Sequence, residues 1–366
     1  MASPPPFTRL TDLAGEVQGG RVLFATDEWF APAQMFLAPS PPVFKAELFT
    51  EFGKWMDGWE SRRRRTPGHD WCIIRLGTPG VLRGFDVDTA FFTGNNVPAV
   101  GIMGCYCPEL TVPDVVTGTT GAMGTCATPE DIAKVDAHLK QAANWFEVLP
   151  RSALGPGYEE TRHNYLPAFS TQPVTHIRVN YFPDGGVARL RAFGEVTPAW
   201  PAAAPGAVVD VGAAAVGGVA LAWSNAHYGV PGNTIAPGRA AKMDEGWETA
   251  RNPRRPAVLE PGADGLVSFE YARDWFVLKL GARAEVEKLG LDTNHYKGNY
   301  PESCVVKGLD DPGLLATPVL DQMQRFTPEN IDSFPWKVVL PRTKCAGHVE
   351  RQYSRGEGTL EGCGPV

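Results

Sequence analysis

The sequence predicts an all-β protein built from two duplicated β-sandwich domains. Blocks of residues return in the same order after about 190 positions, a period far longer than the repeats of a solenoid. Gly 40 and Pro 33 make up about a fifth of the 366 residues. This composition favours short strands joined by turns over a helical bundle. Short runs rich in aromatic and β-branched residues, each closed by glycine, are typical of strands.

Five pairs of blocks indicate the duplication. A Gly-Trp-Glu motif preceded by an acidic residue stands in both halves, and the other four pairs match in residue type and spacing. The paired blocks are residues 57–61 with 245–249, 70–77 with 274–281, 88–95 with 292–299, 19–30 with 217–228, and 145–152 with 336–343. We therefore predict a first domain at residues 12–196 and a second at 210–366.

Each domain is expected to consist mainly of short strands. Residues 71–76 and 275–280 are predicted strands because they are rich in aromatic and β-branched residues. Residues 176–182 and 187–193 alternate apolar and polar side chains around a Pro-Asp-Gly-Gly turn, which predicts a β-hairpin.

One short linking helix is expected in each domain. Thr128, followed by a proline and two acidic residues, predicts a helix over residues 132–146. Thr327 begins a similar pattern in the second domain, and Pro335 cuts it short.

The second domain departs from the first in two places. It carries an insertion around Pro256–Phe269, and it lacks a counterpart of the closing hairpin. The glycine-rich segment after about Tyr353 is therefore expected to be poorly ordered.

Composition argues against several classes of protein. The net charge is −7, and the isoelectric point of about 5.6 gives no support for a nucleic-acid partner. The longest uncharged apolar run, Val211 to Trp223, is well short of the roughly 20 residues that a membrane span needs. Seven irregularly spaced cysteines without a CxxC pair, and no signal-peptide pattern, favour a cytoplasmic protein with reduced thiols. No dinucleotide-binding, Walker, GxSxG or HExxH motif is present.

The densest polar cluster lies in the loop of residues 55–71, which holds the carboxylates Asp57 and Glu60, a histidine and four consecutive arginines. A carboxylate near a histidine allows proton donation and removal at neutral pH, and an arginine can anchor a small anion through two parallel bonds. The second Gly-Trp-Glu motif repeats the acids. The candidate catalytic residues are Asp57, Glu60, His69, Glu245 and Glu248.

Structural interpretations of the same residue types stay open. A run of surface arginines is usually solvated, and a lone histidine is more often structural than catalytic. Asparagine after glycine fits a simple turn, and large buried aromatic residues usually serve packing. These interpretations apply to Arg62, Arg64 and Arg65, to His69, His227 and His295, to Asn95 and Asn299, and to Trp59, Trp71, Trp247 and Trp275.

Four long segments, at residues 52–71, 93–98, 157–165 and 181–191, resemble the allantoicase family. The resemblance covers nearly the whole chain. It implies two tandem jelly-roll domains of the galactose-binding-like type. It also implies a hydrolase acting on carbon–nitrogen bonds of linear amidines, which cleaves allantoate to ureidoglycolate and urea in purine degradation.

The resemblance also implies roles for particular residues. Allantoate carries one carboxylate and two ureido groups on one carbon. An arginine would grip the carboxylate, and Glu60 or Asp57 would accept ureido N–H bonds. One of these carboxylates or His69 would protonate the departing urea nitrogen. The predicted substrate-binding residues are Arg63, Arg251, Asn95, Asn299 and His295. The first domain is preferred for chemistry because it keeps His69.

Several alternatives remain at this point. The residues require no cofactor, although a divalent metal such as Mn would polarise the ureido oxygen by a different route. A non-catalytic tandem β-sandwich that binds a small ligand or carbohydrate is the alternative function, and another ureide-cleaving activity is a third. The expected partner is a small molecule, with no nucleic acid and no membrane, and a homo-oligomer is left open.

Overall fold

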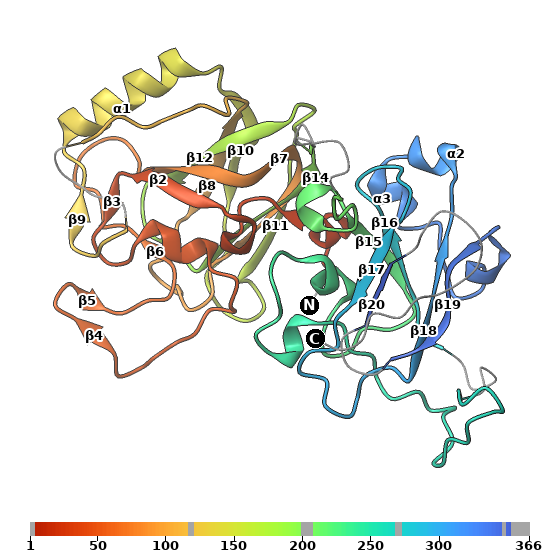
Figure 1. The fold of residues 1–366 in the computed structure, drawn as a ribbon. Helices are drawn as coiled ribbons and strands as arrows, with labels where there is room; N and C mark the ends of the chain where they lie inside the picture. Colours follow the sequence, from red (N-terminus) through yellow and green to blue (C-terminus); the bar gives the residue numbers. More distant parts are fainter. Residues whose placement is uncertain (1–3, 116–120, 199–207, 268–272, 346–348, 353–366) are drawn as a thin grey trace. The chain divides into compact units, whose positions relative to one another are not determined.

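The chain forms two compact units in a computed structural model (Figure 1). The structure describes residues 4–115, 121–198, 208–267, 273–345 and 349–352. The first unit comprises Met1–Trp200 with Ala215–Gly217, and the second comprises Pro201–Ala214 with Gly218–Val366. Within the described ranges, no helix has the length and apolar character of a membrane span.

The first unit is a β-sandwich whose two layers share one long strand, β7 (Trp71–Asp88). The beginning of β7 pairs with β2 and β12, whereas its end pairs with β11 and β14. One layer therefore runs β2–β7–β12–β8–β10 and the other β11–β7–β14–β1. Their bounds are β1 Thr11–Asp12, β2 Arg21–Ala25, β8 Ala99–Cys105, β10 Phe146–Ala153, β11 His163–Pro167, β12 Val174–Phe182 and β14 Arg189–Val196.

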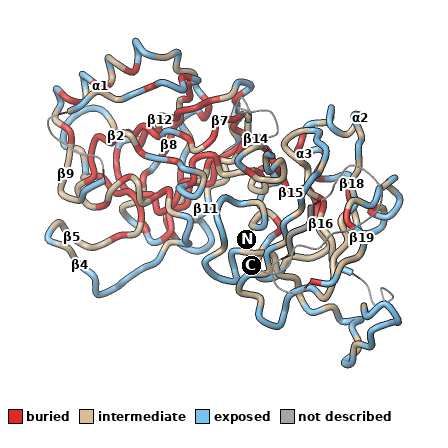
Figure 2. Tube along the Cα trace, in the orientation of Figure 1, coloured by how far each residue is buried: buried red, intermediate tan, exposed pale blue. Residues whose placement is uncertain are grey.

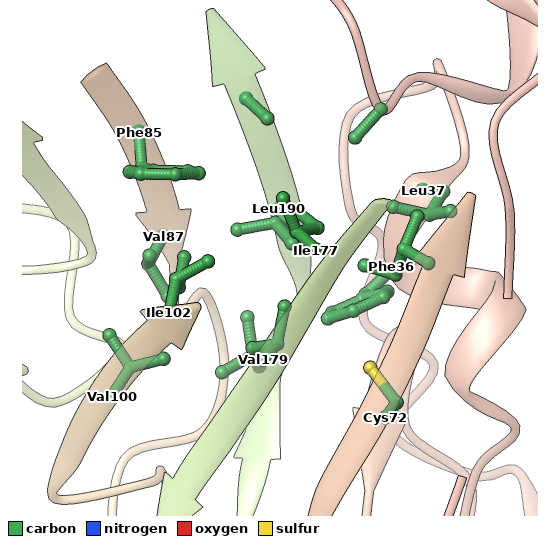
Figure 3. Packing of buried hydrophobic residues seen from close by; sticks show 14 of the residues in the cluster. Phe36, Leu37, Cys72, Phe85, Val87, Val100, Ile102, Ile177, Val179 and Leu190 are labelled. Atoms are coloured by element: carbon green, nitrogen blue, oxygen red, sulfur yellow. The ribbon is translucent and has the colours of Figure 1, made fainter. Parts of the chain in front are cut away.

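The core of the first unit lies between these layers. Alternating side chains of β7, β12 and β14 point inward, as the period of two in a strand requires. Figure 3 shows them together with residues of the 3-10 helix η3 (Ala33–Leu37). The labelled members are Phe36, Leu37, Cys72, Phe85, Val87, Val100, Ile102, Ile177, Val179 and Leu190, all buried. Buried residues are concentrated in this unit (Figure 2).

The hairpin expected at residues 176–193 is wrong. Strand β12 pairs with β7 and β8, whereas β14 pairs with β7 and β1, so the two strands are not partners. The Pro-Asp-Gly-Gly segment instead carries the chain from one layer to the other. On the way, β13 (Gly186–Val187) pairs with β6 (Trp59–Glu60). The alternation of apolar and polar residues and the residues of the turn are the same for a hairpin and for this crossover. The packing of the two strands against the rest of the unit decides which of the two forms.

The expected helix exists as α1 (Pro129–Ala142). It lies in the first unit and overlaps most of the predicted range 132–146. The Thr128 hydroxyl caps it by accepting the Asp131 N–H at 3.1 Å, and Val135 and Leu139 pack against Phe24 and the β7 strand. The helix ends at Ala142 because the following residues enter β10.

We expect Thr128→Ala to destabilise the first unit. Removal of a hydroxyl cap that satisfies a backbone N–H typically costs about 1 kcal/mol. The loss should appear as a lower midpoint of urea unfolding, and Thr128→Ser should recover most of it. A midpoint for Thr128→Ala equal to that of the wild type would contradict this role.

Small paired elements complete the first unit. Strand β3 (Asp27–Glu28) pairs with β9 (Thr125–Cys126), and β4 (Phe49–Thr50) pairs with β5 (Gly53–Lys54). The 3-10 helices η1 (Pro6–Arg9) and η2 (Glu16–Gln18) lie near its start.

The second unit contains three pairs of antiparallel strands in its described part. They are β15 (Val219–Trp223) with β16 (Phe276–Lys279), β17 (Lys288–Leu291) with β20 (Val349–Gln352), and β18 (Ser303–Gly308) with β19 (Lys337–Lys344). Its helical turns are short: η4 Ala214–Val216 (of which Ala215 and Val216 belong to the first unit), η5 Pro231–Ile235, η6 Met243–Glu245, α2 Pro312–Leu315, α3 Val319–Gln322 and η8 Ile331–Ser333.

The helix expected after Thr327 does not form. The Thr327 N–H donates to the Asn330 side chain at 2.8 Å, and a single turn leads into η8. Pro335 lies too close to Thr327 in the sequence for a longer helix to form between them. In the insertion, Pro261 and Val267 form an isolated bridge. The segment after about Tyr353, expected to be poorly ordered, lies outside the described residues.

Candidate functional site

The glutamate of each Gly-Trp-Glu motif binds an asparagine that lies far along the chain. The Asn95 amide donates to Oε1 of Glu60 at 2.6 Å. In the second unit, the Asn299 amide donates to Oε1 of Glu248 at 2.7 Å. The structure thus brings together four predicted site residues in two equivalent pairs, one in each unit.

The same scaffold holds both pairs. The Trp59 indole N–H donates to the Asp27 carbonyl at 2.8 Å, and the Trp247 indole N–H donates to the Asn225 carbonyl at 2.9 Å. These tryptophans therefore serve packing, as the structural interpretation held. The motif glycine is also required, because a Cβ at Gly58, whose φ is +157°, would lie 2.3 Å from the Val187 carbonyl oxygen.

Glu60 is a buried carboxyl group with a shifted protonation equilibrium. The Glu60 residue is 8% exposed. Burial raises the pKa of its carboxyl group to about 7, although the Asn95 hydrogen bond and the Arg63 charge both act to lower that pKa. A carboxyl group with a pKa near neutral can both donate and accept a proton at physiological pH. The arrangement is therefore suited to acid–base chemistry.

Protonation of Glu60 links the stability of the fold to pH. Because the folded-state pKa of about 7 exceeds the ordinary 4.5, the folded protein binds more protons between these values. The contribution of this protonation to the free energy of unfolding is fully present below about pH 4.5 and is lost as the pH rises through about 7. The pKa of the Glu28 carboxyl, also raised by burial to about 7, acts in the same direction.

We expect the free energy of unfolding to fall from about pH 5 to about pH 8 in the wild type and to fall less in Glu60→Gln. Urea titrations across this range measure both slopes. Equal slopes would show that Glu60 does not titrate as the structure indicates.

Arg63 lies next to this pair. Its guanidinium, with a side chain 52% exposed, donates to Oδ1 of the buried Asp184 at 3.2 Å and to the Gly94 carbonyl at 3.0 Å. Asp184 thereby holds the arginine beside the loop that carries Asn95. Sequence reasoning missed Asp184, because a Pro-Asp-Gly-Gly segment reads as an ordinary turn.

The neighbouring arginines are only partly a solvated run. Arg62 pairs with Asp27 at 2.8 Å and its guanidinium lies over the Trp29 ring. Arg64 pairs with the buried Asp70 at 2.8 Å. The solvated interpretation is therefore wrong for these two arginines, because buried carboxylates need a cationic partner. Arg65 is exposed, as expected.

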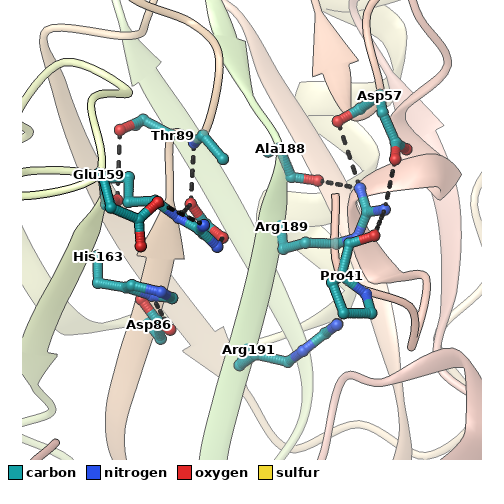
Figure 4. A network of polar contacts seen from close by, with 12 residues as sticks. Pro41, Asp57, Asp86, Thr89, Glu159, His163, Ala188, Arg189 and Arg191 are labelled. Atoms are coloured by element: carbon teal, nitrogen blue, oxygen red, sulfur yellow. Dashed lines mark hydrogen bonds and ion pairs between the residues drawn. The ribbon is translucent and has the colours of Figure 1, made fainter. Parts of the chain in front are cut away.

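Asp57 has a different set of partners from Glu60. Its Oδ2 accepts from the Arg189 guanidinium at 2.8 Å (Figure 4). It also accepts from the Val43 N–H at 2.9 Å. Glu245 similarly accepts the Ala241 N–H at 2.7 Å. Both acids hold the loop before their motif, and neither shares a described contact with the glutamate–asparagine pair.

His69 is also held apart from Glu60. Its Nε2 lies 3.1 Å from the Asn180 side-chain oxygen, and its ring lies against Phe182. Burial, aided by the nearby Arg178, lowers the pKa of this imidazole. The described contacts of His69 include no partner of Glu60, so the structure does not bring the two together.

The second unit has a hollow of about 310 Å³ whose lining includes His295, Arg239, Tyr296 and Lys297. His295 has a φ of +72°, matching the +68° of Phe91 at the equivalent position of the first unit. Its ring Nε2 lies 2.9 Å from the Ala240 carbonyl oxygen and 3.0 Å from the Asn294 amide nitrogen. Oε2 of Glu248 is buried without a hydrogen-bond partner among the described residues.

The predicted arginine of the second unit does not line this hollow. Arg251 is exposed, whereas Arg239 lines the hollow and pairs with Asp292 at 2.8 Å. Sequence reasoning missed Arg239 and Tyr296, because neither belongs to a motif with a recognisable chemical spacing. His227 instead packs edge-on against Tyr228.

A metal ligand set does not emerge from the described part of the chain. No three His, Cys, Asp or Glu side chains there gather closely enough to hold a metal ion. The arrangement instead offers carboxyl, amide and guanidinium groups for binding a small polar molecule and exchanging protons with it.

Comparisons with known proteins agree with the sequence resemblance. A family model described as Allantoicase repeat matches residues 11–197 and 209–361. The chain is 39% identical to a "Probable allantoicase" of Pseudomonas aeruginosa strain UCBPP-PA14, with 100% of this chain and 92% of that protein covered. A "Probable allantoicase" of Pseudomonas syringae pv. syringae is 36% identical over 99% of this chain and 91% of that protein.

Solved structures give the same result. The crystal structure of allantoicase from Saccharomyces cerevisiae is similar with a TM-score of 0.63 and 28% identity, over 96% of this chain and 86% of that chain. A second allantoicase structure has a TM-score of 0.63 and 27% identity, over 94% of this chain and 85% of that chain. The chain as a whole therefore has the architecture of these proteins.

Proposed function

The chain belongs to the allantoicase family, and from this premise we propose that the glutamate–asparagine pairs are where it binds and turns over its substrate. The protein is a hydrolase of purine degradation that cleaves allantoate to ureidoglycolate and urea. The non-catalytic binding module is not favoured.

The observation that supports this site is the buried Glu60 carboxyl with a pKa of about 7, bound to Asn95. Cleavage of the bond between the central carbon and a ureido nitrogen requires a proton for the departing urea. Glu60 in its protonated form supplies that proton, and its carboxylate form then accepts one from water or from the remaining ureido group. One group with a pKa near the working pH serves both steps.

Arg63 is the proposed anchor for the allantoate carboxylate. Its guanidinium is held by Asp184 and the Gly94 carbonyl and is 52% exposed on its side chain. A partly exposed, oriented guanidinium can still form two parallel bonds with an incoming carboxylate. Asn95 would hold Glu60 in place and would also exchange hydrogen bonds with a ureido group of the substrate that lies beside Glu60.

The second repeat is proposed to bind substrate through Glu248, Asn299 and His295. Of these three, His295 lines the hollow of about 310 Å³, which lies within the size range of small-molecule pockets. The first repeat is preferred for proton transfer because of Glu60, and no longer because of His69. Asp57 and Glu245 enter the proposal as residues that hold the loops of the two motifs. His69, held by Asn180, and the exposed Arg251 stay predicted site residues without a described contact to either pair.

Several broader features remain part of the proposal. The repeats are placed at 12–196 and 210–366, which the two compact units and the family matches support. A cytoplasmic location, a small-molecule partner and the absence of nucleic-acid and membrane partners are proposed from composition. A homo-oligomer is left open, and light scattering of the purified protein tests it.

The test is urea release from allantoate by the purified chain. We expect urea and ureidoglycolate to appear in equal amounts. Binding of allantoate without urea would favour the binding module, and faster urea release from ureidoglycolate would favour another ureide-cleaving activity.

A further inference from the structure

Two thiols of the second unit lie on the same face of a pair of strands. Cys304 stands in β18, and Cys345 directly follows β19, its antiparallel partner. The Cys345 N–H donates to the Glu302 carbonyl at 2.9 Å, which extends the strand pairing by one residue. Because opposite residues of paired strands share a face, Cys304 and Cys345 are diagonal neighbours on one side of the sheet. The two thiols are close enough for each to shift the pKa of the other.

The exposures of the two sulfur-bearing residues differ. Cys304 is half-buried, whereas Cys345 is 3% exposed. A small oxidant in the solvent can therefore reach the Cys304 thiol, whereas the Cys345 thiol is shielded from it. Of the other cysteines in the described ranges, Cys72, Cys105 and Cys107 are buried in the first unit.

We propose that Cys304 and Cys345 are a modification site at which a hydroperoxide closes an intramolecular disulfide. The Cys304 thiolate attacks a peroxide oxygen, the O–O bond breaks, and a sulfenic acid and one water form. The Cys345 sulfur then attacks the sulfenic sulfur, the S–S bond forms, and hydroxide leaves as water with the Cys345 proton. Two thiols and one hydrogen peroxide thus give one disulfide and two waters. The site is independent of the proposed hydrolytic function.

Burial makes this reaction slow at neutral pH. Burial and the neighbouring Cys345 raise the pKa of the Cys304 thiol to about 12, and only the thiolate is a good nucleophile. The disulfide is therefore expected under sustained oxidant exposure, and its rate of formation should rise with pH. Once formed, the bond ties together the start of β18 and the end of β19.

The test treats the full chain with hydrogen peroxide and maps its peptides by mass spectrometry after alkylation of free thiols. We expect a cross-linked peptide pair containing Cys304 and Cys345, which thiol reductant separates. The oxidised protein should melt about 5–10 °C higher than the reduced protein, as expected for a native-like cross-link in a domain of this size.

Three variants make the test specific. Cys304→Ser and Cys345→Ser should each abolish the cross-link and the rise in melting temperature. Cys126→Ser, at a half-buried cysteine of the first unit, should leave both unchanged. Oxidation of Cys304 to sulfinic acid in the wild type, without the cross-linked peptide, would overturn the proposal. So would a Cys304–Cys345 peptide that forms only in urea-unfolded protein.

Discussion

Glu60→Gln is expected to lower kcat for allantoate hydrolysis by roughly 10²–10⁴-fold, the usual contribution of a general acid or base. Glutamine is nearly isosteric with glutamate, so it keeps the shape of the buried site while removing the titratable proton. The reaction loses the group that protonates the departing urea nitrogen, whereas binding through Arg63 is retained. KM should therefore change much less than kcat.

The pH profile provides a second readout. The wild-type kcat/KM should change around the Glu60 pKa of about 7, and Glu60→Gln should lose that transition. Glu248→Gln is the matched variant, because Glu248 binds Asn299 at 2.7 Å just as Glu60 binds Asn95 at 2.6 Å. We expect Glu248→Gln to raise KM more than it lowers kcat.

The outcomes separate the roles of the two repeats. A large loss of kcat in Glu248→Gln alone would place the proton transfer in the second repeat. Wild-type urea production and melting temperature in both variants would make the recurring glutamate only a structural residue. Glu47→Gln, at an exposed glutamate, controls for the general effect of the substitution.

Trp59→Ala is expected to cost the first unit about 3–5 kcal/mol of unfolding free energy, as for other large-to-small changes at buried aromatic residues. Trp59 is fully buried. Its ring centroid lies 4.0 Å from that of Tyr181 and 5.5 Å from that of Phe36. Its indole N–H satisfies the Asp27 carbonyl. The truncation therefore leaves a cavity and an unpaired acceptor together.

Trp247→Ala is the matched substitution in the second unit and should cost less. Trp247 is only half-buried, although it makes the equivalent hydrogen bond to the Asn225 carbonyl at 2.9 Å. Urea unfolding combined with amide exchange assigns each loss to its own unit. Equal losses in the two variants would show that burial does not distinguish the two repeats. Trp59→Phe, which keeps much of the packing, should fall between the wild type and Trp59→Ala.

The residues around Glu60 show how far sequence reasoning reaches. The repeated Gly-Trp-Glu motif pointed to the two glutamates, and the structure holds each of them in the same local way. Asn95 and Asn299 were predicted as substrate-binding residues from another repeated block, and the structure pairs each of them with the glutamate of its own unit. The loop also suggested Asp57 and His69, which lie close to Glu60 in sequence but are held by Arg189 and Asn180 in the structure.

The sequence by itself determined the duplication, the β class and the Thr128 cap, because these depend on residue order and on interactions between near neighbours in the chain. Only the tertiary structure decided the partners of β12 and β14, the ion pairs of Arg62 and Arg64, and the raised pKa of Glu60. Strand partners and pKa values depend on which distant segments pack together and exclude water. The free energy that selects this packing is shared by the whole core, so no local pattern of residues contains it.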